Sequence, residues 1–218
     1  MKSNRELETK VLDELEWEPR VRAADIGVAV NDGVVTLTGF ADSYAEKLAS
    51  EEAVKRVADV RGIANEVVVR LPAFRERTDT DIARAAVNGL EWDVFVPHNS
   101  VKVTVENSWV TLDGEVERQF QKHAAENAVC RLAGVKGVRN LISIKPQASA
   151  MQIHADIERA LKRSAEVDAQ SIVVETRLGG KVILRGSVRS FVEQQEAERV
   201  AWDAPGITDV DNQILIEL

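Results

Sequence analysis

The chain has 218 residues, of which 44% are hydrophobic, 29% are charged and 5% are aromatic. These proportions are typical of a folded chain and exclude a disordered one, and they indicate cores built mainly from Val, Ile, Leu and Ala. The formal net charge of −8 predicts repulsion from bare nucleic acid and from anionic lipid, so we expect no nucleic-acid partner.

No stretch approaches the roughly 18–20 consecutive apolar residues that a membrane-spanning helix needs. The first residues, MKSNRELE, carry charges where a signal peptide would place its apolar stretch. We therefore expect a cytoplasmic protein. The single cysteine, Cys130, allows no disulfide within the chain.

The periodicity of apolar residues predicts the elements of the N-terminal third. A first helix has one apolar face, made of Leu7, Val11, Leu12 and Leu15. Segments 26–30 and 35–39 then predict two strands, joined by a turn at 31–33 whose residues tolerate positive φ. A second helix opens with a Ser-Tyr-Ala-Glu capping box at 43–46, and the alternating apolar positions Val67 and Val69 predict a last strand.

This pattern recurs twice along the chain. The motif V-x-L-x-G at 35–39 returns at 110–114 and at 182–186, with a period of 75 and then 72 residues. Each terminal Gly is followed 26 residues later by an asparagine, namely Asn65, Asn140 and Asn212. Such regularity indicates a repeat architecture. We predict three tandem units, over residues 1–71, 76–145 and 149–218.

The order of elements predicts the fold of each unit. The first two strands must form an antiparallel hairpin, and the helix between the second and third strands makes that pair parallel. Both helices should cover one face of a small three-stranded mixed sheet, which is an α+β architecture. Pro72 and Pro146 end the units, and because the linkers are short we expect neighbouring units to be in contact.

This pattern resembles the BON domain over nearly the whole chain. The residues that carry the resemblance are the V-x-L-x-G strand ends, a second helix with a face of small residues, and the signature G-V-x-x-V-x-N. That signature stands as GVKGVRN at 134–140 and as GITDVDN at 206–212, whereas unit 1 departs from it with DVRGIAN at 59–65. The resemblance, which extends to osmotically inducible periplasmic stress proteins, implies attachment to phospholipid or contact with proteins, and no catalysis.

Candidate chemistry is weak at every recurring position. The repeated glycines Gly39, Gly114 and Gly186 could cradle a phosphate, but we interpret them as strand-to-helix turns. His123 and Cys130 face the same way on one helix, yet zinc needs three or four protein ligands. The asparagine before each last strand is interpreted as a partner for backbone at a turn. We expect no catalytic, cofactor or metal site and no small-molecule substrate.

Residues that differ between units mark candidate surfaces. Exposed aromatic residues and a basic cluster near the end of unit 2 form the binding-surface candidates, which are Phe40, Phe95, Trp202, Arg131, Lys136 and Arg139. Packing between units is the alternative for the aromatic residues, and a solvated face is the alternative for the basic ones. Trp17 and Trp92, at equivalent positions, are interpreted as lids on the first helices.

These features predict a non-enzymatic scaffold for stress response or envelope maintenance, with a protein partner or self-association. The alternative is a peripheral protein that binds a phospholipid surface through Phe40 or Phe95.

Overall fold

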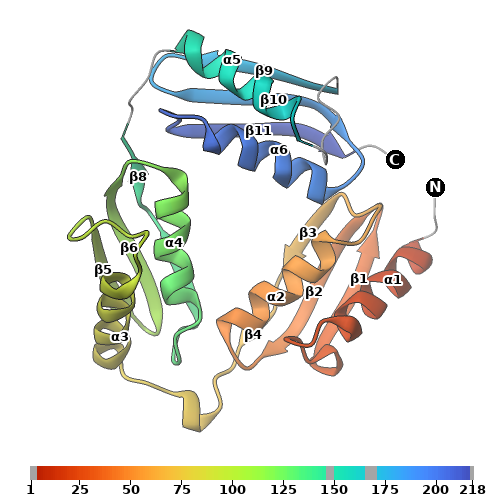
Figure 1. Ribbon diagram of the computed structural model, residues 1–218. Helices are drawn as coiled ribbons and strands as arrows, with labels where there is room; N and C mark the ends of the chain where they lie inside the picture. Colours follow the sequence, from red (N-terminus) through yellow and green to blue (C-terminus); the bar gives the residue numbers. More distant parts are fainter. Residues whose placement is uncertain (1–3, 146–149, 165–170, 217–218) are drawn as a thin grey trace.

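A computed structural model describes residues 4–145, 150–164 and 171–216. Three units follow one another, each with the order helix, strand, strand, helix, strand (Figure 1). Unit 1 comprises α1 (Asn4–Trp17), β1 (Ile26–Asn31), β2 (Val34–Ala41), α2 (Tyr44–Lys55), β3 (Gly62–Asn65) and β4 (Val68–Val69). Unit 2 comprises α3 (Asp79–Trp92), β5 (Val101–Glu106), β6 (Trp109–Val116), α4 (Gln119–Cys130), β7 (Gly137–Asn140) and β8 (Ser143–Ile144). Unit 3 comprises α5 (Ala150–Leu161), β9 (Ile172–Arg177), β10 (Lys181–Val188), α6 (Phe191–Asp203) and β11 (Asp209–Ile216).

The sheet topology is the predicted one in every unit. The second strand is central, and it pairs antiparallel with the first strand and parallel with the last. In units 1 and 2 the last strand is interrupted without a change of register, so that β3 and β4, and likewise β7 and β8, pair in turn with one central strand. The predicted α+β class with three tandem units is confirmed.

Short turns join the hairpins, with two residues in units 1 and 2 and three residues, 178–180, in unit 3. The positive φ that the sequence predicted is present at Asp32 and Gly33, at Asn107 and Ser108, and at Gly179 and Gly180. In units 1 and 2 this geometry matches the twist of a two-residue hairpin, and Gly, Asn and Asp adopt it at least cost.

The interpretation of the repeated glycines as strand-to-helix turns is wrong. Gly39, Gly114 and Gly186 lie inside the central strands β2, β6 and β10, two residues before each strand ends. Their φ angles are +108°, +146° and +135°, and a Cβ atom at each would collide with a backbone carbonyl oxygen that precedes the first strand. These positions need glycine because the backbone passes too close for any side chain.

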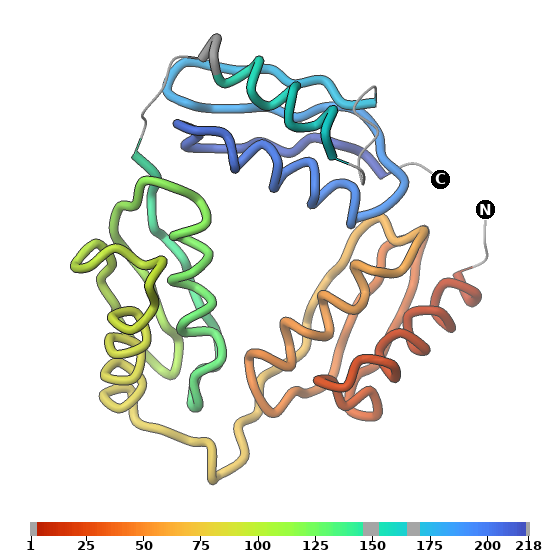
Figure 2. The backbone as a smooth tube through the Cα atoms, viewed as in Figure 1, coloured from red at the N-terminus to blue at the C-terminus, as the bar shows by residue number. Residues whose placement is uncertain are grey.

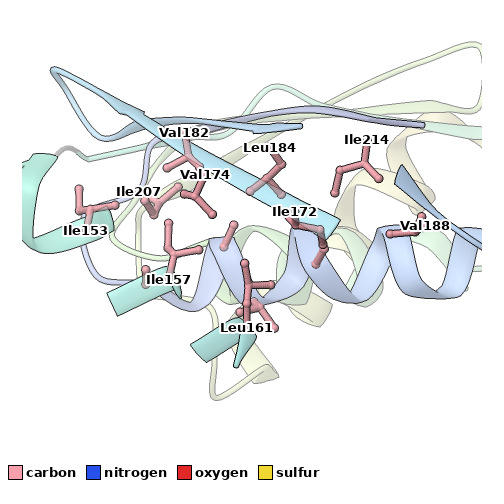
Figure 3. Close-up of a cluster of buried hydrophobic side chains, with 14 residues drawn as sticks. Ile153, Ile157, Leu161, Ile172, Val174, Val182, Leu184, Val188, Ile207 and Ile214 are labelled. Carbon is pink, nitrogen blue, oxygen red and sulfur yellow. The ribbon is translucent and has the colours of Figure 1, made fainter. Parts of the chain in front are cut away.

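Each unit has its own hydrophobic core between its two helices and one face of its sheet. Figure 3 shows the core of unit 3, where Ile157 and Leu161 from α5 pack against Val174, Leu184 and Ile214 from the sheet. Units 1 and 2 bury equivalent sets of Val, Leu, Ile and Ala. No helix within the described residues is long and apolar enough to span a bilayer.

The three units are arranged around a common centre. In Figures 1 and 2 the second helices, α2, α4 and α6, lie on the inner side of this arrangement, and the first helices lie farther out. The second helix of each unit is therefore the element placed to contact a neighbouring unit.

We predict that Gly114→Ala destabilises the protein whereas Gly89→Ala in the same unit stabilises it. Gly114 combines positive φ with a backbone collision, and such a strained residue costs about 1–3 kcal/mol. Gly89 is inside α3, where an added Cβ makes only an ordinary van der Waals contact. Alanine at this position should therefore raise the free energy of unfolding by about 0.5–1 kcal/mol. Thermal unfolding followed by circular dichroism measures both, and equal effects of the two substitutions would contradict this account of the strand glycine.

Candidate functional site

The recurring asparagine ties the second helix to the last strand in every unit. In unit 1, Asn65 Oδ1 accepts a hydrogen bond from Val67 N at 3.3 Å, and Asn65 Nδ2 donates to Lys47 O at 3.2 Å and to Glu51 Oε2 at 3.3 Å. Asn140 and Asn212 make the same three contacts in units 2 and 3. The asparagine bonds backbone, as the sequence indicated, but it lies within the last strand and not at a turn before it, since it ends β3 and β7 and lies inside β11. Its amide is fully used within its own unit.

A glutamate of the second helix completes this tether, and sequence reasoning missed it. Glu51, Glu126 and Glu198 each follow the motif glycine by 12 residues and accept a hydrogen bond from the asparagine. Burial alone would raise the pKa of Glu51, but hydrogen bonds from Lys55 and Asn65 lower it below its usual value. The identical spacing was the signal that could have identified these residues.

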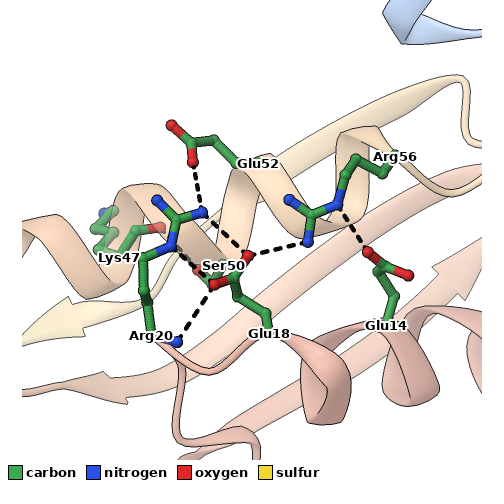
Figure 4. A network of polar contacts seen from close by, with 7 residues as sticks. All are labelled: Glu14, Glu18, Arg20, Lys47, Ser50, Glu52 and Arg56. Atoms are coloured by element: carbon green, nitrogen blue, oxygen red, sulfur yellow. Dashed lines mark hydrogen bonds and ion pairs between the residues drawn. The ribbon is translucent and has the colours of Figure 1, made fainter.

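A second polar cluster joins the two helices of unit 1 (Figure 4). The Glu18 carboxylate accepts hydrogen bonds from Arg20 Nε at 2.8 Å and from Arg56 Nη2 at 3.0 Å, and Arg56 also bonds Glu14 at 2.7 Å. Glu52 holds Arg20 from the solvent side at 3.0 Å. We call Glu14, Glu18, Arg20, Glu52 and Arg56 the ionic cluster.

The electrostatics of the ionic cluster are those of a structural clamp. Glu18 is buried, with 6% of its surface exposed. Hydrogen bonding from Arg20 is the largest influence and outweighs burial, so the pKa of Glu18 falls from 4.5 to about 2. A carboxylate held ionised by two guanidinium groups is a poor proton donor or acceptor near neutral pH, so the cluster is no candidate for acid–base catalysis.

Two of the contacts between units involve the first residue of a second helix. Tyr44, the first residue of α2, packs against the core of unit 2, and Phe191, the first residue of α6, packs against the core of unit 1. Burial raises the pKa of the Tyr44 hydroxyl, which also has a hydrogen bond with the backbone of Val138. The expected contact between neighbouring units is therefore present, and it includes one between the first and third units.

The junction between units 2 and 3 differs from the other two. Gln119 stands at the first position of α4, where α2 and α6 have an aromatic residue, and the aromatic side chain comes instead from Trp202 near the end of α6. Trp202 packs against the cores of both units, and α4 contacts α6 directly. The predicted alternative of packing between units thus applies to Trp202.

A groove of about 690 Å³ opens at this junction. Its walls include Phe95 and Phe120 from unit 2 and Trp202 from unit 3, and the two phenylalanine rings meet edge to face with centroids 5.9 Å apart. Polar residues along the groove are Asp93, Gln119, His123, Asn127, Gln195, Glu198, Arg199 and Asp203. We call it the aromatic groove, and it brings together two of the aromatic residues that the sequence singled out.

Unit 1 lacks the aromatic side chains at the positions equivalent to this surface. With the repeat period of 75 residues, Phe95 corresponds to Arg20 and Phe120 to Ala45. A guanidinium held in the ionic cluster is thus replaced by an exposed ring in unit 2, since Phe95 is 59% and Phe120 53% exposed. This divergence between two copies of one fold makes the aromatic groove the candidate functional site. An alignment of the second helices of the three units would have shown that Gln119 replaces an aromatic residue and that Phe120 follows it.

The other candidates of the sequence lie elsewhere. Phe40 in β2 is 40% exposed, and the Arg70 guanidinium stacks over its ring at 3.2 Å. Arg131 directly follows α4, Lys136 precedes β7, and Arg139 lies within β7. All three basic residues are exposed, and none forms an ion pair with another residue of the described ranges or lines the aromatic groove.

The interpretation of Trp17 and Trp92 as lids is wrong. Their side chains are 83% and 87% exposed, because each tryptophan is the last residue of its helix and points away from the core that the helix covers.

Several other polar groups of the described residues are candidates for a chemical site. No three His, Cys, Asp or Glu residues are placed to hold a metal in the part of the chain that the structure describes. Burial raises the pKa of the Cys130 thiol, which disfavours a reactive thiolate. A groove between α5 and α6 is lined by charges, but Arg199 pairs there with Glu196 and Asp203, as Arg159 pairs with Asp156.

The fold and the site define a protein of three tandem α-β-β-α-β domains whose recurring residues hold the fold together. The family model of the BON domain matches residues 3–70, 78–146 and 149–217. The chain therefore belongs to the BON domain family, as its sequence pattern indicated.

Known proteins similar to this chain include Osmotically-inducible protein Y of Escherichia coli (strain K12), which is 32% identical over 136 residues. The match covers 57% of this chain and 64% of that relative, so it spans less than two thirds of the relative's length. The resemblance to osmotically inducible proteins is confirmed.

Two solved structures of CdsD, a structural protein of the type III secretion system of Chlamydia trachomatis, are 13% and 14% identical to this chain. The first covers 100% of both chains, and the second covers 97% of this chain and 92% of the other. Their TM-scores of 0.28 and 0.27 are too low to relate the overall arrangements.

We predict that Glu18→Gln removes an acid-sensitive part of the stability. Because the folded pKa of Glu18 is depressed, its contribution is present above the unfolded value of 4.5 and is lost as pH falls through about 2. The unsubstituted chain should be more stable than the variant at neutral pH, and the difference should shrink across that window. Urea unfolding at several pH values measures it.

Glu52→Gln is the matched control, because Glu52 contacts the same Arg20 with a side chain that is 56% exposed. It should change stability little at any pH. A difference between the unsubstituted chain and Glu18→Gln that stays constant as pH falls would contradict the assignment.

Proposed function

We propose that this chain is a non-enzymatic binding and assembly module of the osmotic stress response, and that a protein partner docks at the aromatic groove. The main support is the divergence of unit 2 from unit 1, which puts exposed Phe95 and Phe120 where the chain elsewhere has Arg20 and Ala45. Exposed apolar surface of this kind marks interaction sites, and aromatic residues are enriched in the cores of interfaces. The stress context is taken from the name of the relative, Osmotically-inducible protein Y.

The recurring residues support a role without catalysis. The motif glycines avoid a collision that a Cβ atom would make with the backbone. The asparagine and the glutamate of each unit bond each other in the tether between the second helix and the last strand. A catalytic role shared by the units would need shared polar residues that remain available to a substrate. Since the shared residues are structural, we assign the function to the surfaces where the units differ.

Site-specific photocrosslinking tests this proposal. A photoreactive amino acid replaces Phe120 in the aromatic groove, and in a control protein it replaces Val173, which is 58% exposed on β9 outside the groove. In cells under osmotic upshift we expect a specific protein adduct from position 120 and none from position 173. Adducts from neither position, or equally from both, would overturn the proposal.

A phospholipid surface is the second candidate, because Trp92, Val94 and Phe95 form an exposed apolar segment. If a phospholipid surface is the target, the chain should co-sediment with liposomes, and Phe95→Ser should weaken this binding. Phe40→Ser should not weaken it, because Arg70 already covers the Phe40 ring. Absence of co-sedimentation at every anionic content and salt concentration would remove this candidate.

The cytoplasmic location stays a prediction from the sequence, and the periplasm is the alternative that the osmotic stress context raises. Fractionation of cells that produce the full-length protein distinguishes the two compartments.

A further inference from the structure

We propose that the chain forms a two-fold homodimer in which Trp92 and Val94 of each copy pack into the aromatic groove of the other. This inference rests on the proposed function, because it names a second copy of the chain as the protein that docks at the groove.

Trp92 and Val94 form an apolar projection on unit 2. Trp92 is 87% exposed and Val94 is 89% exposed, although both have large apolar side chains. The Trp92 indole N–H makes no hydrogen bond with another residue that the structure describes. Covering this segment would remove apolar surface from water, at about 25 cal/mol for each Å².

The aromatic groove is a suitable receptor for such a segment. Its volume of about 690 Å³ lies within the roughly 300–1,000 Å³ of binding pockets, and the rings of Phe95, Phe120 and Trp202 line it. Gln119 also lines the groove. The exposed Trp92 ring of a second copy can pack against these rings, because aromatic pairs stabilise a contact beyond the area that they bury.

The position of the projection favours a second copy over other occupants. Asp93 and Phe95 form part of the groove wall, and Trp92 and Val94 are their direct neighbours in the chain. Projection and receptor are therefore adjacent in unit 2, and a two-fold axis beside the groove would bring the projection of each copy to the groove of the other. The groove is also continuous with the established contact between α4 and α6.

A bilayer is the less suitable occupant. The segment 92–95 reads W-D-V-F, and it holds a carboxylate but no Lys or Arg to attract anionic head groups. The Asp93 carboxylate accepts a hydrogen bond from Phe95 N at 2.9 Å, which fixes this negative charge beside the projection.

Unit 1 provides a matched control for the projection. Trp17 occupies the position equivalent to Trp92 and is 83% exposed, so the two indoles are similarly accessible. Beside Trp17, however, lies the ionic cluster with Glu18 and Arg20 instead of an aromatic groove. A dimer held by the proposed contact must depend on Trp92 and not on Trp17.

Sedimentation equilibrium of the full-length chain, over a wide range of protein concentration, tests the inference. We expect a reversible monomer–dimer equilibrium that tightens as salt screens the −8 charge of each copy. Trp92→Ala, which truncates the projection, and Phe120→Arg, which places a charge in the receptor, should each weaken the dimer at least about tenfold. Trp17→Ala should leave the dissociation constant unchanged. Circular dichroism checks that every variant remains folded.

Each alternative outcome has a definite meaning. A chain that is monomeric at all concentrations, or a dimer that Trp17→Ala and Trp92→Ala weaken equally, overturns the inference. A monomer that binds anionic vesicles through Trp92 also overturns it and assigns the projection to a membrane. If position 120 still crosslinks to a different protein while the chain is monomeric, the inference fails and the proposed function stands; if it crosslinks to no protein, both fail.

Discussion

The hydrogen bonds of one asparagine join the second helix to the sheet in each unit, and the rest of the architecture depends on that attachment. Asn65 and its two counterparts each bond a helix carbonyl, a helix glutamate and the backbone of the last strand. The parallel strand that follows the helix forms few local contacts of its own, so its position relative to the helix must be set by such a long-range contact. Because the same three bonds recur, the three units present their second helices in the same way.

The second helices then become the elements through which the units meet. Tyr44 at the start of α2 and Phe191 at the start of α6 each pack against the core of a neighbouring unit, while Trp202 near the end of α6 contacts both cores at the remaining junction. Each junction therefore has one half-buried aromatic side chain, although two different helix positions supply it. Aromatic side chains of this size contribute strongly to the energy of small interfaces.

Divergence between the units, and not the residues that they share, distinguishes the aromatic groove. In unit 1, Glu18 and Arg56 join the two helices through charge-assisted hydrogen bonds, and Arg20 occupies the surface beside them. In unit 2 the corresponding surface has Phe95, whose ring faces Phe120. One fold thus supports an ionic surface in one copy and an apolar surface in the next, since neither set contributes to the common core.

The sequence by itself determined the unit count, the order and pairing of the strands, the family and the tight turns, because periodicity and turn chemistry are local properties. It did not reveal that the central strand continues past Gly39 to Ala41 or that glycine is required there, since the carbonyl oxygen of Asp25 that excludes a side chain comes from the chain before the first strand. Nor did it place Trp92 in solvent or bring Phe95 to Trp202. Those facts depend on how whole units pack together, and the tertiary structure decided them because side chains far apart in the chain meet only once the helices and sheets are assembled.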